Sequence, residues 1–457
     1  MRKEVTKPSP LKNNTKTNSK LPSYKKIKIL LYIVLIFLGI GFIQQIFFAK
    51  ETISPLQEIT TLPVIKEVRN ITGANKYLVK GQTTDRINVL LLGQGGVEHE
   101  GPYLTDTIII ASYKPSTGQV AMISIPRDLQ VESKELGKVK INAINAYGEV
   151  QGYPGGGSAL VAKTIEDVFK IPIHYWIRVD FEAFKKIIDI LGGIEVNIER
   201  SFTDYQYPAG ENKYKTVSFE KGLQTLNGER ALEYVRSRHS AEEEGDFSRA
   251  RRQQKLLLAL KDKILSSSTY LRVDKIAAIY NELQKNVQTN AQIWEIPNFI
   301  RLYQKYGISD ITTKILDDSP LGPFYSTIDE NGAYILLPKI SDFSEVQFII
   351  KNIFTISDIK KEVPRLAIQN GTTRAGLAQG TAEILKTFEF KIAQISNAKS
   401  QNYKKTVLYD FTGGEKEKSR KFLETTLQTK SQKTLPVIDN VENIDFLIIL
   451  GEDQISQ

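Results

Sequence analysis

TIIIASYKPSTGQVAMISI, residues 107–125, predicts two β-strands that pair in an antiparallel hairpin. Its first half, Thr107–Tyr113, is apolar almost throughout, which is typical of a buried strand, and Gln119–Ile125 is the second strand. The residues between them, Lys114-Pro-Ser-Thr-Gly118, have the chemistry of a turn. A further apolar segment, Ile87–Leu92, comes before this stretch. We therefore expect a three-stranded meander at the start of the folded chain.

Helical periodicity and strand-like segments alternate after this meander, which predicts an α/β fold. Another strand, turn and helix pattern begins near Glu362 and indicates a second, smaller domain. The predicted helices of the first domain include Ala159–Phe169, Phe181–Leu191 and Asp246–Leu265, and a strand is predicted at Ile194–Ile198.

The positive charge of the chain is concentrated at its N-terminus. The 457 residues have a net charge of +9 and include no cysteine, which excludes a disulfide framework and a cysteine nucleophile. Residues 1–28 contain nine Lys and Arg against one acid, and predict a disordered cytoplasmic tail. Residues 29–49 are apolar and long enough to span a bilayer, although a buried helix of a soluble protein is the alternative. We therefore expect a single-pass signal anchor in the plasma membrane, an extracytoplasmic stalk at 50–84, and no nucleic-acid partner for the folded part.

Three loops of the predicted meander meet at one edge of the sheet. They carry Gly93, Asp106 and the pair Arg127–Asp128. Carboxylates at such an edge suit a hard cation, and an arginine suits a phosphate. The alternatives are a turn or capping role for Asp106 and a local ion pair between Arg127 and Asp128.

Glu233-Tyr-Val-Arg-Ser-Arg-His239 adds two arginines to the candidate site. A strand over these residues would put Tyr234, Arg236 and Arg238 on one face. Two arginines that are neighbours on one face repel each other unless an anion or an acid lies between them. This pattern favours an anion-binding site.

A second arginine-rich stretch, residues 246–254, opens a predicted helix for which Asp246 is the expected N-cap. Residues at helical spacing form one stripe along the surface of this helix. The stripe begins with a guanidinium and an amide and ends with leucines. Such a stripe suits an anionic head group on a hydrocarbon tail, and the alternative is an ordinary amphipathic helix with snorkelling arginines. The stripe contains Arg249, Gln253, Leu256 and Leu260, with Arg252 beside it and Arg251 pointing away.

These motifs resemble those of the LytR–CpsA–Psr family of cell-envelope proteins. They occur in the family's order over roughly residues 85–260, and residues 363–451 resemble the C-terminal domain that often follows in this family. The matching stretches include Asn88-Val-Leu-Leu-Leu-Gly93, Thr105-Asp-Thr-Ile108, Ser124-Ile-Pro-Arg-Asp128, Lys140-Ile-Asn-Ala143, Leu226-Asn-Gly-Glu-Arg-Ala-Leu232, Tyr234-Val-Arg-Ser-Arg238 and Asp246–Gln254.

The resemblance implies a mixed central sheet flanked by helices over residues 85–358 and a small α/β domain over 362–452. It also implies a membrane-anchored phosphotransferase with Mg²⁺ as its cofactor. Such an enzyme moves a glycopolymer from a polyprenyl-pyrophosphate carrier to peptidoglycan. The alternatives are a non-catalytic protein that binds polyprenyl lipid or cell-wall glycan, and a polyprenyl pyrophosphatase.

The resemblance implies a role for each candidate residue. Asp106 would bind the metal, and the leucine stripe would line a tunnel for the prenyl chain. The implied catalytic residues are Asp106, Arg127, Arg236 and Arg238, and the implied substrate-binding residues are Arg127, Arg236, Arg238, Arg249, Arg252 and Gln253.

Two positions depart from the family pattern. Family members usually have a second metal-binding aspartate where this chain has Gly95, and an arginine where it has Leu104. The loop between these positions contains Glu98 and His99. We expect Glu98 or His99 to replace the missing metal ligand.

Overall fold

The computed structural model describes residues 78–454 with several gaps. The predicted tail at 1–28, the predicted anchor at 29–49 and most of the predicted stalk lie outside the described residues, as do Glu98 and His99. Within the described part of the chain, no helix has both the length and the apolar character that crossing a bilayer requires. The gaps are 97–100, 211–212, 241–244, 267–277, 280–281, 283–285, 293–294, 341 and 433–442.

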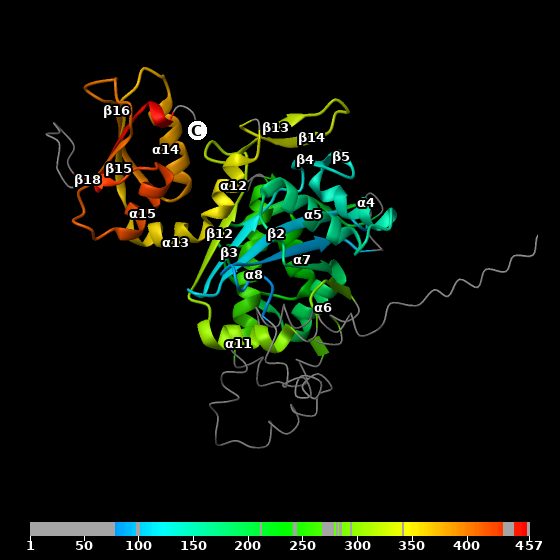
Figure 1. Ribbon diagram of the computed structural model, residues 1–457. Coiled ribbons are helices and arrows are strands. Elements are labelled where there is room, and N and C mark those ends of the chain that lie inside the picture. Colours follow the sequence, from blue (N-terminus) through cyan, green and yellow to red (C-terminus); the bar gives the residue numbers. More distant parts are fainter. Residues whose placement is uncertain are drawn as a thin grey trace, which may run out of the picture.

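A six-stranded sheet in the order β11-β6-β1-β2-β3-β12 forms the centre of the first domain (Figure 1). β1, β2 and β3 form the predicted antiparallel meander, in which Ile110 pairs with Leu90 on one side and Ile123 on the other. β6 and β12 run parallel to β1 and β3, so the expected mixed sheet is confirmed. The strands are β1 (Ile87–Gln94), β2 (Thr105–Lys114), β3 (Gln119–Ser124), β6 (Tyr175–Asp180), β11 (Val287–Thr289) and β12 (Asp310–Ile315).

Helices cover both faces of this sheet, because the side chains of each strand alternate between two apolar cores. Leu90 and Ile110 point into one core, which α4, α5, α12 and α13 close. Val89 and Ile177 point into the other core, which α6, α7, α8 and α11 close. The helices are α4 (Ile144–Val150), α5 (Gly157–Phe169), α6 (Phe181–Leu191), α7 (Gly228–Arg236), α8 (Gly245–Leu265), α11 (Ile296–Tyr306), α12 (Ser344–Lys351) and α13 (Ile353–Glu362).

Two-stranded sheets lie around the edges of this domain. The hairpin of β13 and β14 is joined to the end of the meander, because Leu336 N–H donates a hydrogen bond to the backbone oxygen of Asp128 at 3.0 Å. The strand pairs are β4 (Gln130–Ser133) with β5 (Gly137–Lys140), β7 (Ile194–Ile198) with β10 (Gly222–Leu226), β8 (Phe202–Pro208) with β9 (Tyr214–Phe219), and β13 (Phe324–Ile328) with β14 (Tyr334–Pro338).

The C-terminal domain is built on a second sheet, in the order β16-β15-β19-β17-β18. α13 lies between the two domains (Figure 1), and its Ile356 and Ile359 belong to an apolar core that continues from the first sheet to β15 and α15. The domains are therefore packed against each other through a shared core. The elements are β15 (Arg365–Asn370), α14 (Leu377–Thr387), β16 (Lys391–Asn397), β17 (Val407–Asp410), α15 (Glu417–Thr426), β18 (Ser431–Gln432) and β19 (Phe446–Leu450).

The prediction of a strand over residues 233–239 is wrong. α7 occupies most of that segment, and the side chain of Asn227 caps it by accepting the Arg230 N–H at 2.9 Å. The helix buries Ala231, Leu232 and Val235 on one side, and this apolar packing outweighs the short alternating pattern that suggested a strand. Arg236 is the last residue of the helix and Arg238 lies beyond it, so the two arginines do not share a strand face.

Candidate functional site

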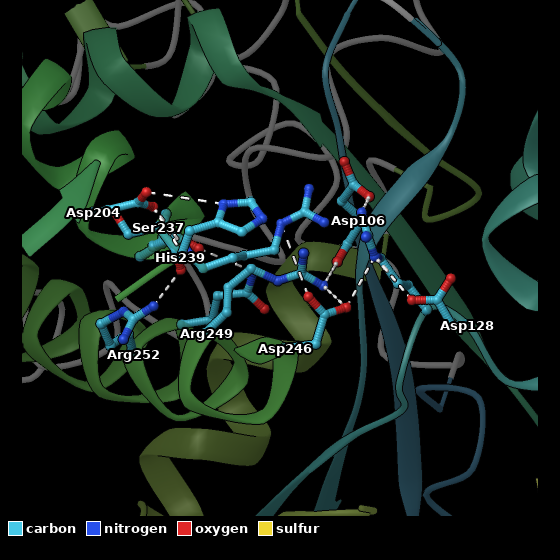
Figure 2. Close-up of polar contacts among 12 residues, drawn as sticks. Asp106, Asp128, Asp204, Ser237, His239, Asp246, Arg249 and Arg252 are labelled. Atoms are coloured by element: carbon cyan, nitrogen blue, oxygen red, sulfur yellow. Dashed lines mark hydrogen bonds and ion pairs between the residues drawn. The ribbon is translucent and has the colours of Figure 1, made fainter. Parts of the chain in front are cut away.

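The end of the meander and the start of α8 meet at one edge of the central sheet. Asp106 is the second residue of β2, Arg127 follows β3, and Asp246 and Arg249 lie near the start of α8 (Figure 2). Arg238 comes from the segment between α7 and α8. We call these five residues the arginine cluster.

Arg127 is the centre of the ion pairs in this cluster. Its Nη1 lies 2.6 Å from Asp106 Oδ1, and its Nε lies 3.0 Å from Asp246 Oδ2 and 3.3 Å from Asp128 Oδ2. Burial disfavours the charge of Arg127, but Asp246 and Asp106 outweigh this effect and raise its pKa. The local ion pair with Asp128, which the sequence left open, is thus present together with the longer-range contacts.

Asp246 connects the arginines to one another. α8 begins at Gly245, so Asp246 lies in its first turn and is not the predicted N-cap. Its carboxylate lies 3.1 Å from Arg249 Nη2 and 3.9 Å from Arg238 Nε. Burial alone would raise the pKa of Asp246, but Arg249 and Arg127 outweigh burial and lower it. Asp246 is therefore ionised and balances charges that would otherwise repel.

Arg249 is a buried charge with an unused donor. The residue is 5% exposed, and its Nη2 also donates to the backbone oxygen of Asp106 at 3.4 Å. Its Nε is buried and has no hydrogen-bond partner among the described residues. Burial lowers the pKa of Arg249 to about 10, although Asp246 opposes this effect. An unpaired buried donor is costly, so the free protein leaves the charge of Arg249 incompletely satisfied.

An apolar cavity of about 260 Å³ adjoins the arginine cluster. It lies between the central sheet and α6, α7 and α8, and a smaller polar pocket contains Asp106, Arg127, Asp246 and Arg249. Gln253 lines both and marks their junction. The predicted stripe on α8 therefore passes from the polar pocket into the apolar cavity. The cavity lining includes Leu256, Leu257, Leu260 and Ile264 of α8, Ile187 of α6 and Ile109 of β2.

Family models match both domains. The LytR_cpsA_psr family model matches residues 60–351, and the model described as LytR cell envelope-related transcriptional attenuator matches residues 364–453. The chain belongs to the LytR_cpsA_psr family. The resemblance seen in the sequence is thereby confirmed for the first domain and for the C-terminal domain.

Several LytR_cpsA_psr relatives have names that state an activity. The polyisoprenyl-teichoic acid–peptidoglycan teichoic acid transferase TagV of Bacillus subtilis is 32% identical over 53% of this chain and 58% of its own length. A transferase of the same kind, TagU of Oceanobacillus iheyensis, is 34% identical over 48% of this chain and 63% of its own length. The chain thus spans less than two thirds of these two relatives. The crystal structure of B. subtilis TagV, at 28% identity, covers 59% of this chain and 97% of its own, with a TM-score of 0.46.

Two candidate arginines of this LytR_cpsA_psr protein contact residues outside the arginine cluster. Arg236 stacks on Phe181, whose ring centroid is 4.6 Å away and which lines the apolar cavity. Arg252 is buried and donates hydrogen bonds to the backbone oxygens of Tyr234, at 2.8 Å, and of Ser237. The guanidinium of Arg252 thus fixes the C-terminal end of α7 and does not point into the polar pocket.

Sequence reasoning missed Asp204, which lies beside His239 (Figure 2) and binds the backbone of Arg238. Its buried carboxylate accepts the backbone N–H groups of Arg238 at 2.8 Å and His239 at 3.3 Å. It thereby holds the connecting segment in place. Asp204 is 34 residues from Arg238 in a separate hairpin, so no local spacing could reveal the contact.

Of the carboxylates around Arg127, Asp106 is the one to which the resemblance assigns the implied magnesium ion. Burial alone would raise the pKa of Asp106, but Arg127 and Arg249 outweigh it and keep the carboxylate ionised. No group of three or more metal-ligating side chains occurs in the described part of the chain. Mg²⁺ is often held by one or two carboxylates together with substrate phosphates, so Asp106 fits a metal that is shared with a phosphate ligand.

Proposed function

We propose that this chain is a phosphotransferase that moves a glycopolymer from a polyprenyl-pyrophosphate carrier to a hydroxyl group of peptidoglycan. The observation that carries the proposal is the junction at Gln253, where the arginine cluster adjoins an apolar cavity. The names of the relatives, which are polyisoprenyl-teichoic acid transferases, support the same reaction class. We also propose that residues 29–49 anchor the chain in the plasma membrane, with residues 1–28 in the cytoplasm.

The arginine cluster suits a pyrophosphate in charge and in donor geometry. Guanidinium groups bind phosphate oxygens through paired, charge-assisted hydrogen bonds. Arg249 supplies the unused Nε donor, and Arg127 and Arg238 lie around the same carboxylate, that of Asp246. In the free protein Asp246 and Asp106 balance the arginines. A bound pyrophosphate would share these arginines and would relieve the unpaired donor.

The apolar cavity suits the hydrocarbon tail of the same molecule. The part of α8 that lines the cavity extends from Gln253 to Ile264. At 1.5 Å per residue, this part of the helix is about 16 Å long. Each buried methylene contributes about 0.8 kcal/mol, so even part of a prenyl chain adds substantial affinity. Gln253 would lie where the head group meets the tail.

The proposed reaction needs no nucleophile from the protein. The oxygen of an acceptor hydroxyl forms a bond to the phosphorus that carries the glycan, and the proton of the hydroxyl passes to water. The bond from that phosphorus to the carrier's phosphate breaks, and prenyl phosphate leaves with the electron pair. Arg127, Arg238 and Arg249 stabilise the negative charge that gathers on the phosphate oxygens. Magnesium, when bound, would be held by Asp106 and phosphate oxygens and would neutralise part of that charge.

The test uses the full chain in detergent with a lipid-pyrophosphate glycan, magnesium and peptidoglycan. The proposal predicts a phosphodiester-linked glycan on the peptidoglycan and release of lipid monophosphate. Lipid binding without product would instead support a non-catalytic binding protein. Lipid cleavage without an acceptor would support a pyrophosphatase. Either result would overturn the proposed transfer.

Arg249 and Arg251 form a matched pair of variants on the same helix. Arg249 is buried in the cluster, whereas Arg251 is exposed and donates to Ser248 Oγ. Arg249→Ala is expected to lose at least about tenfold in affinity for the lipid-pyrophosphate, because one charge-assisted hydrogen bond contributes about 1.5–3 kcal/mol. Arg251→Ala is expected to bind like the parent protein, and equal losses in both variants would contradict the assigned role.

A further inference from the structure

We propose that the hairpin of β13 and β14 binds the glycan strand that accepts the transferred polymer, and that Tyr334 stacks on a sugar ring of this strand. The inference rests on the proposed function and identifies how the same site would hold its second substrate. The hairpin residues were not among the candidate residues of the sequence.

The hairpin lies directly beside the arginine cluster. In addition to the hydrogen bond from Leu336 to Asp128, Leu336 forms a parallel bridge with Leu129. Arg127 and Asp128 lie in the turn that comes directly before Leu129, and Tyr334 is two residues before Leu336 on β14. Burial raises the pKa of Tyr334. The negative charges of Asp318, Asp128 and Asp246 raise it further, which agrees with a position near the cluster. The phenol of Tyr334 is therefore within electrostatic reach of the cluster.

One face of the hairpin presents an exposed apolar surface next to the cluster. Tyr334 is 44% exposed, and its cross-strand partner Ile328 is 60% exposed. Directly opposed residues of an antiparallel pair share one face, so the two side chains are neighbours. A flat ring beside an aliphatic side chain suits the C–H face of a pyranose. Tyr325 is also 44% exposed but is three residues from Ile328, so it belongs to the other face.

The position of this face matches the geometry of an in-line displacement. The attacking and leaving oxygens lie on opposite sides of the reacting phosphorus. The leaving prenyl phosphate belongs on the side of the cavity, which begins at Gln253 and extends to Ile264. Asp246 lies in the first turn of α8, at the end of the helix away from Ile264. The hairpin that carries Tyr334 is hydrogen-bonded to Asp128, and Arg127 Nε contacts both Asp128 and Asp246.

This geometry favours the acceptor glycan, rather than the glycan of the donor, as the molecule that binds to the hairpin. The glycan of the donor is covalently joined to the pyrophosphate and is held through it by the arginines. The acceptor has no such connection, so it needs a surface of its own next to the phosphorus. A neutral sugar ring has no strong charge to offer, and stacking on an exposed aromatic ring is a contact that it can make.

The experiment measures transfer by the full chain at varied concentrations of soluble glycan-strand fragments. For Tyr334→Ala we expect the KM for the fragments to rise about five- to tenfold, as loss of one stacking contact requires. The affinity for the lipid donor should change less than about twofold. Tyr334→Phe keeps the ring and should retain the KM of the parent protein, and Tyr325→Ala serves as the matched control on the opposite face.

A second readout does not depend on transfer. Saturation-transfer NMR with the glycan fragments alone should show contacts to sugar C–H protons in the parent protein and in Tyr325→Ala, and these contacts should be lost in Tyr334→Ala. An unchanged KM together with unchanged sugar contacts in Tyr334→Ala would overturn the inference. A rise in donor KM alone would also overturn it, because the hairpin would then bind the donor glycan. Absence of transfer by the parent protein, with sugar contacts that depend on Tyr334, would refute the proposed function and leave the glycan site in place.

Discussion

Replacing Arg249 by methionine should make the unliganded protein more stable and weaken its binding of the lipid-pyrophosphate. Arg249 is buried, its pKa is lowered to about 10, and its Nε lacks a partner among the described residues. At 1.36 kcal/mol per pH unit, this lowered pKa corresponds to a cost of about 3 kcal/mol for folding with the charge in place. Methionine fills a similar volume without a charge.

The lowered pKa already includes the attraction of Asp246. The net gain is smaller than this cost, because the variant also loses the hydrogen bond from Arg249 to the backbone oxygen of Asp106, which contributes about 1–2 kcal/mol. We therefore expect a net stabilisation of about 1–2 kcal/mol and a rise in Tm of about 2–5 °C. The sign follows from the lowered pKa of a base: the cost is fully present below pH 10 and fades as the pH rises above it.

Thermal unfolding of Arg249→Met can be followed by the fluorescence of Trp176, which is buried in the central sheet. Binding of the lipid-pyrophosphate is measured on the same samples and should weaken at least about tenfold. Arg251→Met is the control and should leave both quantities unchanged. A lower Tm combined with unchanged lipid affinity would refute the view that the buried charge of Arg249 costs stability and serves ligand binding.

Three further variants test other parts of the site. Asp246→Asn should lower the Tm near pH 7 and weaken lipid-pyrophosphate binding. Because the pKa of Asp246 is lowered, its stabilisation exists above pH 4 and is lost in acid, so unfolding curves of variant and parent should converge at low pH. Asp204→Ala leaves backbone donors unpaired and should cost about 1–3 kcal/mol in thermal unfolding, together with a higher donor KM; an unchanged KM would argue against its support of Arg238. Leu260→Trp fills the cavity and should weaken binding of long-tailed lipids while a short-tailed analogue binds as before; equal losses for both would contradict a tail in this cavity.

Strong apolar patterns and turn residues made most of the fold predictable. The meander over residues 87–125 and the helix Phe181–Leu191 followed from such patterns, and Gly192 ends that helix in the left-handed conformation that glycine readily adopts. The segment after Asn227 was harder, because its five-residue alternation suits a strand while its apolar spacing suits a helix. The packing of α7 on its neighbours decided between them.

The site was predictable only where residues lie near each other along the chain or on one helix. The stripe of Arg249 and Gln253 could be derived from helical spacing, and it does line the polar pocket. The bridging role of Asp246 could not, because its partner Arg127 is 119 residues away. Arg252 lies on α8 beside the stripe, as helical spacing predicts. Its guanidinium, however, donates hydrogen bonds to backbone carbonyl groups at the C-terminal end of α7. The same limit applies to Tyr334, whose neighbours are set by the chain path alone.

The shared core at α13 fixes the direction in which the C-terminal domain faces. Ile356 and Ile359 contribute to a core that includes residues of both sheets, and Lys361 Nζ of α13 lies 3.1 Å from Asp310 Oδ2 of β12 in the first sheet. Turning one domain relative to the other would expose these apolar side chains to water. The shared core therefore holds the C-terminal domain against the first domain on one side. Anything that it holds would reach the transfer site from one set direction.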